Sequence, residues 1–202
     1  MNQAHPIIGI IIGIIVGSTR PGRNALAVAK WATEIAGSRT DASFEMIDIA
    51  DFGLPLLDEP FSALASARMG REYTQPHTKR WSDTISRFDG YVLIAPEYNF
   101  GIPAALKNAL DYLHAEWNDK AAGFISYGSN GGVRSTAQLR LALAELKVAT
   151  VVPEVGMSLY TDFENYSVFK PAEVHTQQVH AMLDQLVSWS SALLQVRGKA
   201  HA

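Results

Sequence analysis

The 202-residue sequence contains no cysteine. Disulfide bonds, thiolate metal sites and a cysteine nucleophile are therefore excluded. A protein without cysteine depends on no oxidising compartment for its cross-links, and we expect this one to be cytoplasmic.

The sequence also lacks an excess of charge of either sign. It has 17 lysine and arginine residues and 20 aspartate and glutamate residues, which gives a net charge of −3 with neutral histidines. Proteins that bind nucleic acid or anionic membranes carry strongly basic surfaces. We therefore expect no nucleic-acid or membrane partner, and any anion site must be local.

Apolar runs long enough to cross a membrane are missing too. The run Ile7 to Val16 is about ten residues long, whereas a bilayer-spanning helix needs roughly 20. It has neither the basic start nor the small-residue cleavage site of a signal peptide. We interpret it as a buried strand in a globular chain whose length favours a single domain over residues 1–202.

Strand patterns alternate with helix patterns along the chain. Continuous or alternating apolar runs predict five strands, at residues 8–16, 43–49, 91–95, 122–127 and 149–152. This order predicts an α/β fold, a doubly wound five-stranded parallel sheet with helices on both faces.

Apolar residues at helical spacing predict the helices between these strands. Helices are expected at residues 25–36, around 81–88 and from Pro103 to Leu113. A further helix has the stripe Ala137, Leu141, Ala144 and Val148, and the last helix carries Val179, Met182, Leu183, Leu186, Val187, Leu193 and Leu194. Residues 50–75 and 153–170 are predicted as long loops, which line an acceptor pocket, bury against a second subunit or cover the sheet edge.

The first strand runs into the loop "GSTRPGRN" (residues 17–24). Gly17 permits a tight turn, Ser18, Thr19 and Asn24 offer hydrogen-bond donors, and Arg20 and Arg23 offer planar cations suited to phosphate. The start of the following helix adds unpaired N–H groups. The loop predicts a phosphate site, with a capped helix start and two solvated arginines as the simpler alternative.

Two common nucleotide motifs fail at this loop. Gly17 and Gly22 have P-loop spacing, but Arg23 and Asn24 stand where a P-loop has lysine and a metal-binding hydroxyl. The dinucleotide pattern G-x-G-x-x-G does not occur. We therefore predict a phosphate monoester held without a metal.

Two more loops follow strands at the same predicted sheet edge. "PEYNFG" (residues 96–101) presents aromatic and amide groups suited to the edge of a flat heterocycle, or to ordinary turns. "SYGSNGG" (residues 126–132) has three glycines that permit close approach to its backbone. Together the three loops predict a phosphorylated flat cofactor, and flavin mononucleotide (FMN) is the obvious candidate.

Four segments, "GSTRPGRN", "PLLDEP", "PEYNFGIPAALKNALDYL" and "SYGSNGG", together resemble the NADPH-dependent FMN reductase family over about residues 13–152. That family is flavodoxin-like and includes quinone, azo-dye and chromate reductases. The resemblance implies non-covalent FMN, NADPH or NADH as co-substrate, and a homodimer or homotetramer in which a neighbouring subunit helps enclose the flavin.

By position, the resemblance also implies three groups of cofactor-binding residues. The phosphate would lie on Ser18, Arg20, Arg23 and Asn24. The ring would lie along Pro96, Glu97, Tyr98 and Asn99, with Tyr127, Gly128, Gly131 and Gly132 on its other side.

The sequence shows no catalytic triad, nucleophile elbow or metal cluster, and His77 and His114 have no carboxylate partner at ligand spacing. We expect no catalytic side chain and no metal, because a flavin carries the redox chemistry itself. The predicted reaction is hydride transfer from a reduced nicotinamide to FMN and then to a quinone or similar planar acceptor. The N–H groups of residues 96–99 would stabilise charge on the reduced ring. The alternatives are a flavodoxin-like electron carrier and a non-redox module that binds phosphate esters.

Overall fold

The computed structural model describes residues 9–200, and side chains up to residue 198. Its first strand, β1, spans Ile10–Val16, so the predicted start of that strand at residue 8 lies outside the described residues. The other main strands are β2 (Ala42–Asp48), β3 (Gly90–Pro96) and β4 (Lys120–Gly128). Each matches a predicted strand within about three residues.

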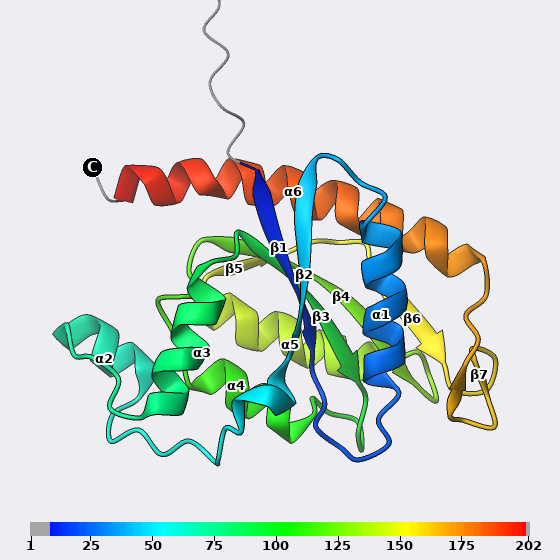
Figure 1. Cartoon of the computed structure of the whole chain (residues 1–202), viewed down its shortest axis with the longest axis horizontal. Helices are drawn as coiled ribbons and strands as arrows, with labels where there is room; N and C mark the ends of the chain where they lie inside the picture. The colour runs from blue at the N-terminus through cyan, green and yellow to red at the C-terminus, as the bar shows by residue number, and fades with distance from the viewer. Residues whose placement is uncertain (1–8, 201–202) are drawn as a thin grey trace, which may run out of the picture.

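Together with β5 (Val148–Thr150), these strands form one parallel sheet in the order β2-β1-β3-β4-β5, which confirms the predicted fold (Figure 1). The register places Val16 beside Ile94 and Pro96 beside Tyr127. The chain therefore leaves β1, β3 and β4 at neighbouring points of one sheet edge.

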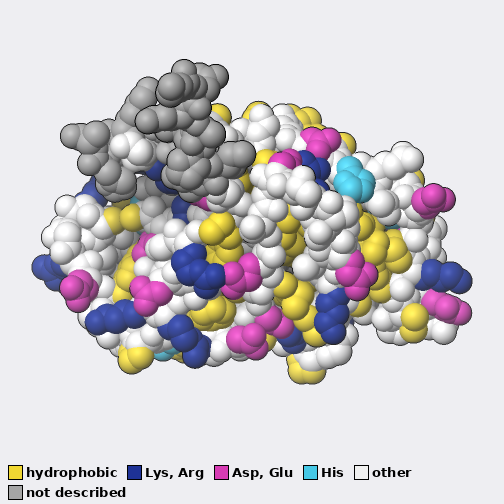
Figure 2. Space-filling model, turned by 45° about the horizontal axis from the view of Figure 1, so that its top comes forward, with side chains coloured by type: hydrophobic (Ala, Val, Ile, Leu, Met, Phe, Trp, Pro, Cys, Tyr) yellow, Lys and Arg dark blue, Asp and Glu magenta, His cyan; other side chains and the backbone are white. Residues whose placement is uncertain are grey.

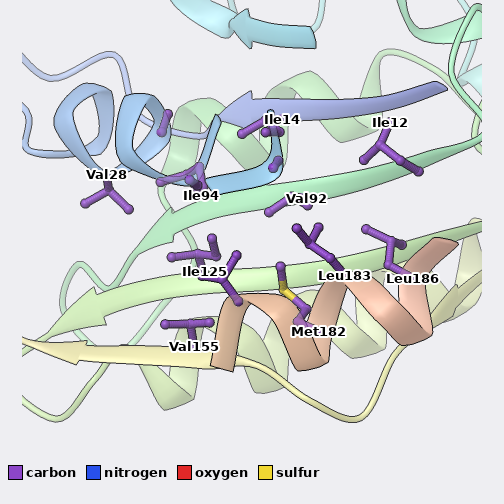
Figure 3. Close-up of a cluster of buried hydrophobic side chains, with 14 of the residues drawn as sticks. Ile12, Ile14, Val28, Val92, Ile94, Ile125, Val155, Met182, Leu183 and Leu186 are labelled. Carbon is purple, nitrogen blue, oxygen red and sulfur yellow. The ribbon is translucent and has the colours of Figure 1, made fainter. Parts of the chain in front are cut away.

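One face of the sheet is covered by α1 (Ala25–Ala36) and α6 (Val174–Ala200). Alternate residues of the strands point into this layer, among them Ile12, Ile14, Val92 and Ile94. Figure 3 shows them facing Val28 of α1 and Met182, Leu183 and Leu186 of α6. The predicted stripe of the last helix is confirmed for Val179, Met182, Leu183, Leu186 and Val187, which are buried.

The opposite face is covered by α3 (Pro76–Ser86), α4 (Ala104–Asp111) and α5 (Val133–Glu145). Trp81 and Trp117 are fully buried there, and their indole nitrogens donate to Ala109 O and Leu110 O. With apolar helices on both faces, every residue of β3 and β4 is buried, as continuous apolar strands predict.

The predicted stripe of α5 is wrong in phase. Leu141 is 76% exposed, whereas Leu143 is 1% exposed. Leu139, Ser135 and Thr136 complete the buried face. Because small polar residues share that face, the apolar pattern alone did not reveal it.

The fifth predicted strand, residues 149–152, ends early at Thr150, and a further strand follows it inside the predicted loop. β5 (Val148–Thr150) pairs with the start of β4, and β6 (Val155–Ser158) pairs with its end. Pro153, which cannot donate a ladder hydrogen bond, lies in the interruption. The sheet therefore has a sixth strand that continues its edge.

Both predicted long loops contain secondary structure. Residues 50–75 include most of a 3₁₀ turn, η1 (Ile49–Phe52), and the short helix α2 (Ala63–Met69). Residues 153–170 include β6 and a small hairpin of β7 (Phe163–Glu164) and β8 (Val168–Phe169). Phe163 and Phe169 pack against the core that contains Tyr127, whereas Tyr160 and Tyr166 are exposed.

Charges of both signs are interspersed over the face in Figure 2, with apolar atoms between them. Within residues 9–200, none of the helices has the length and hydropathy to cross a bilayer. This face thus has the balanced charge that the composition predicts.

The corrected phase of α5 gives a stability test. We expect Leu143→Ala to lower the free energy of unfolding by about 2–5 kcal/mol, because it leaves a cavity under the sheet. Leu141→Ala on the same helix should change it by no more than about 0.5 kcal/mol. Urea denaturation of both variants measures this, and equal losses would contradict the observed burial.

Candidate functional site

The carboxyl ends of β1, β3 and β4 are joined by hydrogen bonds. Gly17 N donates to Ile94 O (2.9 Å), and Glu97 N donates to Tyr127 O (2.9 Å). A Cβ at Gly17 would lie 2.6 Å from Ile94 O, so only glycine at this position lets the loop after β1 come this close to β3. The three predicted loops, namely the β1 loop (residues 17–24), the β3 loop (residues 96–101) and the β4 loop (residues 126–132), are therefore neighbours.

The β1 loop and the β3 loop meet at a tyrosine hydroxyl. Ser18 Oγ lies 2.9 Å from Tyr98 Oη, and Arg20 Nε donates to the same oxygen at 3.3 Å. The hydrogen bond with Tyr98 raises the pKa of Arg20, so the guanidinium stays charged. Two hydroxyl groups, of Ser18 and Tyr98, thus lie together with the cation of Arg20.

The two remaining predicted phosphate contacts of the β1 loop, Arg23 and Asn24, have partners inside the protein. Arg23 forms an ion pair with Asp48, at the end of β2. Asn24 Nδ2 donates to the carbonyl of Tyr166 in the β7–β8 hairpin at 2.9 Å. Asn24 precedes α1 without capping it through its side chain, so it ties the hairpin to the loop instead.

The β3 loop is held by its own backbone and by α5. Tyr98 and Gly101 exchange backbone hydrogen bonds of 3.2 and 3.0 Å. Asn99 and Phe100 have φ of 48° and 67°, a left-handed conformation that side chains rarely adopt. The carboxylate of Glu97 accepts from Arg134 N at 3.0 Å and from Arg134 Nη1 at 2.8 Å.

Part of the predicted role of this backbone is wrong. Glu97 N and Tyr98 N are engaged within the protein, and Pro96 has no N–H group. Within the described part of the chain, only Asn99 N and Phe100 N of this turn lack an acceptor. These two N–H groups are the donors that the loop has left for a ligand.

The β4 loop is built from close approaches at Gly128, Gly131 and Gly132. A Cβ at Gly128 would lie 3.1 Å from the Cβ of Glu97, and one at Gly132 would lie 2.7 Å from the Cβ of Ser126. Gly131 and Gly132 also have φ of +70° and +76°. Gly128 therefore fits the β4 loop against the β3 loop, whereas Gly131 lies against Gly156 of β6 and Gly132 against the end of β4. Part of the reason for these glycines is thus structural.

Tyr127 carries a polar atom that the fold leaves unsatisfied. The residue is 4% exposed, yet its hydroxyl has no hydrogen-bond partner among residues 9–198. Burial raises the pKa of Tyr127, the nearby Tyr98 adds to the shift, and Arg20 opposes it. The neutral O–H, beside Arg20, is thus a donor without an acceptor, as is Arg23 Nε in the same region.

A cavity of about 460 Å³ opens beside the β1 loop. Its walls come from the β1 loop, the turn after β2 and the start of α4: Thr19, Ile49, Ala50, Gly53, Leu54, Ala105 and Asn108. Asn108, which the sequence interpretation did not assign, donates to Pro55 O at 2.6 Å and accepts from Leu57 N at 3.0 Å. The sequence signal that could have identified Asn108 is its place in the "LKN" part of the segment that resembles the family.

The expectation that His77 has no carboxylate partner is wrong. His77 Nε2 lies 3.0 Å from Asp58 Oδ1, which also accepts from Tyr112 Oη at 2.9 Å. This cluster fixes the loop after η1 against α3 and α4. Across residues 9–198, no group of three or more histidine, aspartate or glutamate side chains is placed to hold a metal ion.

Comparison with known proteins gives a consistent result. The sequence profile of the NADPH-dependent FMN reductase family matches residues 10–162. A relative from Nectria sp, named NAD(P)H-dependent FMN reductase ntnL, is 41% identical over 70% of this chain and 71% of its own length. NAD(P)H-dependent FMN reductase C4B3.06c of Schizosaccharomyces pombe is 36% identical over 82% of each chain. A quinone reductase of Pseudomonas putida is 28% identical over 88% of this chain and 93% of its own.

Solved structures share the fold at low sequence identity. The flavoenzyme NAD(P)H:(acceptor) oxidoreductase FerB of Paracoccus denitrificans has a TM-score of 0.68 at 22% identity, covering 91% of this chain and 98% of its own. The apo form of the NADH:FMN oxidoreductase EmoB has a TM-score of 0.63 at 22% identity, covering 88% of each chain.

The unsatisfied hydroxyl gives the second prediction. We expect Tyr127→Phe to raise the free energy of unfolding of the cofactor-free protein by about 1 kcal/mol, because it removes a buried donor without an acceptor. In Tyr91 the hydroxyl donates to Ile85 O at 2.9 Å, so Tyr91→Phe should lower it by a similar amount. Chemical denaturation without added cofactor measures both, and a loss of stability in Tyr127→Phe would show that the hydroxyl is satisfied.

Proposed function

Because the chain belongs to the NADPH-dependent FMN reductase family, we propose that FMN binds across the carboxyl ends of β1, β3 and β4. The protein is an FMN-dependent NAD(P)H oxidoreductase, with relatives that reduce FMN and quinones. The observation that best supports this place of binding for FMN is the buried hydroxyl of Tyr127, which has no hydrogen-bond partner in the described residues.

The phosphate of FMN fits the donors of the β1 loop. Ser18 Oγ, Arg20 and Tyr127 Oη lie around Tyr98, and the N-terminus of α1 follows directly. Tyr127 Oη and Arg23 Nε are donors that a phosphate would satisfy. Arg23 and Asn24 contribute chiefly by holding the loop to Asp48 and Tyr166.

The ring would lie against the joined ends of the β3 loop and the β4 loop. The left-handed turn at Asn99 and Phe100 offers two adjacent N–H groups, and Gly128 keeps the β4 loop close to Glu97. Bound FMN supplies the hydride chemistry, accepting from NAD(P)H and passing electrons to a planar acceptor such as a quinone. The N–H groups of Asn99 and Phe100 would stabilise negative charge at the ring edge, because fixed donors need no reorganisation.

The cofactor proposal is tested by Arg20→Ala. We expect FMN affinity to fall by about 1–3 kcal/mol, the typical value of a charge-assisted hydrogen bond. Arg39→Ala is the control, because Arg39 pairs with Asp41 and Asp184, away from the loop. Fluorescence titration of the cofactor-free protein with FMN measures this, and equal affinity in both variants would remove Arg20 from the phosphate site.

NADPH oxidation should depend on both FMN and an added quinone. An electron carrier would bind FMN without steady turnover, and a non-redox module would remain colourless with FMN. Either result would contradict the enzyme assignment.

We also propose a single FMN-binding domain that works in the cytoplasm as a homo-oligomer. Both apolar cores share one sheet, which favours one domain. Exposed apolar side chains gather on the segment beside the cavity, namely Leu56, Leu57, Phe61 and Met69. A second subunit that covers this segment would help enclose the cofactor. The reaction uses a reduced nicotinamide, which favours a reducing compartment.

The oligomer is tested by sedimentation. We expect the wild-type protein to sediment as a dimer or tetramer, and Leu56→Asp to shift it toward monomer, because a charge would be buried at the interface. Leu56 is 84% exposed in the single chain, and Leu141→Asp on α5 is a control of similar exposure. A strictly monomeric wild-type protein would contradict the proposal.

A further inference from the structure

The Glu97 carboxylate is an anion buried inside the proposed FMN site. Its side chain is 6% exposed, and both of its oxygens accept from a single residue, Arg134. The contacts come from the first turn of α5, through the backbone N–H at 3.0 Å and the guanidinium at 2.8 Å. Burying a carboxylate costs free energy unless a cation and hydrogen bonds compensate it, and Arg134 provides both.

The same guanidinium reaches the far end of the β3 loop. Arg134 Cζ lies 3.9 Å from the centre of the Phe100 ring, a cation–π distance, although Phe100 is 63% exposed. Phe100 is also one of the two residues in the left-handed turn. Gln138, one turn further along α5, donates to Phe100 O at 2.9 Å and accepts from Ile102 N at 3.3 Å. One helix therefore holds both ends of the turn.

We propose that Arg134 is a positioning residue for FMN: it holds Glu97 and Phe100 so that the N–H groups between them face the ring edge, and it neutralises the Glu97 carboxylate. The inference rests on the proposed placement of FMN against the β3 and β4 loops. In this arrangement the Glu97 side chain contacts Arg134 inside the protein and does not contact the cofactor directly.

The first test compares two arginines of α5. Arg134→Met should weaken FMN binding at least about tenfold, because the turn and the Glu97 carboxylate both lose the guanidinium, and only the backbone N–H of residue 134 remains on the carboxylate. Arg140→Met is the matched control: Arg140 also pairs with a glutamate (Glu154, 2.8 Å), lies over an aromatic ring (Phe124, 4.8 Å) and donates to Val151 O (2.7 Å). It should bind FMN within about twofold of wild type.

Backbone hydrogen exchange of the cofactor-free protein is an independent readout. Exchange at Gly101 and Ile102, whose N–H groups are hydrogen-bonded in this turn, should accelerate in Arg134→Met. It should stay at the wild-type rate in Arg140→Met, because of the two arginines only Arg134 contacts this turn. Arg134→Lys should restore part of the FMN affinity, since it keeps the charge but not the guanidinium geometry.

The midpoint potential of bound FMN separates electrostatics from loosened structure. Removing Arg134 leaves the Glu97 anion uncompensated, which disfavours the more negative reduced cofactor, so the potential should become more negative in Arg134→Met. Glu97→Gln removes the anion and leaves the cation, so its potential should become more positive. Loosening alone would move both variants in the same direction, and that outcome would overturn the neutralising role.

The outcomes also separate this inference from the proposed function. If wild-type protein binds FMN and Arg134→Met binds it equally well, or if Arg140→Met loses as much affinity, the positioning role is wrong while the cofactor site stands. If wild-type protein itself fails to bind FMN, the proposed function is wrong.

Discussion

The parallel pairing of β1, β3 and β4 is the constraint on which the rest of the structure depends. Because their registers are fixed, Val16 lies beside Ile94 and Pro96 beside Tyr127, and three chain exits open at one edge. The two layers of apolar side chains that stabilise the sheet keep these exits in place. The polar loops therefore do not have to supply the stability of the site that they form.

Several polar groups of the candidate site lack partners inside the protein. Tyr127 Oη and Arg23 Nε are buried without partners in the described chain, and Asn99 and Phe100 have strained backbones. Each feature costs free energy in the protein alone. A phosphorylated ring that satisfies these donors would recover part of that cost on binding, so the same atoms link local instability to affinity.

The β3 loop shows how a local motif depends on a distant helix. Its hydrogen bonds run to Tyr127 in β4 and to Arg134 and Gln138 in α5. "PEYN" alone predicts a turn at a flat ligand, and the predicted N–H donors there included two that the fold already uses. The left-handed turn is held by the start of α5 beside it, which is a property of the packed sheet.

The sequence by itself determined the first four strands, their parallel arrangement and the edge at which the three loops meet, because continuous apolar runs and abrupt polar exits are local signals. It also indicated Ser18 and Arg20 as polar groups of one loop, and the structure joins them at Tyr98 Oη. Only the tertiary structure decided that Arg23 pairs with Asp48, that Arg134 pairs with Glu97, which side of α5 is buried and that the sheet edge breaks at Pro153. Those outcomes depend on which side chains meet in the folded protein, and the spacing of residues along the chain does not determine these long-range contacts.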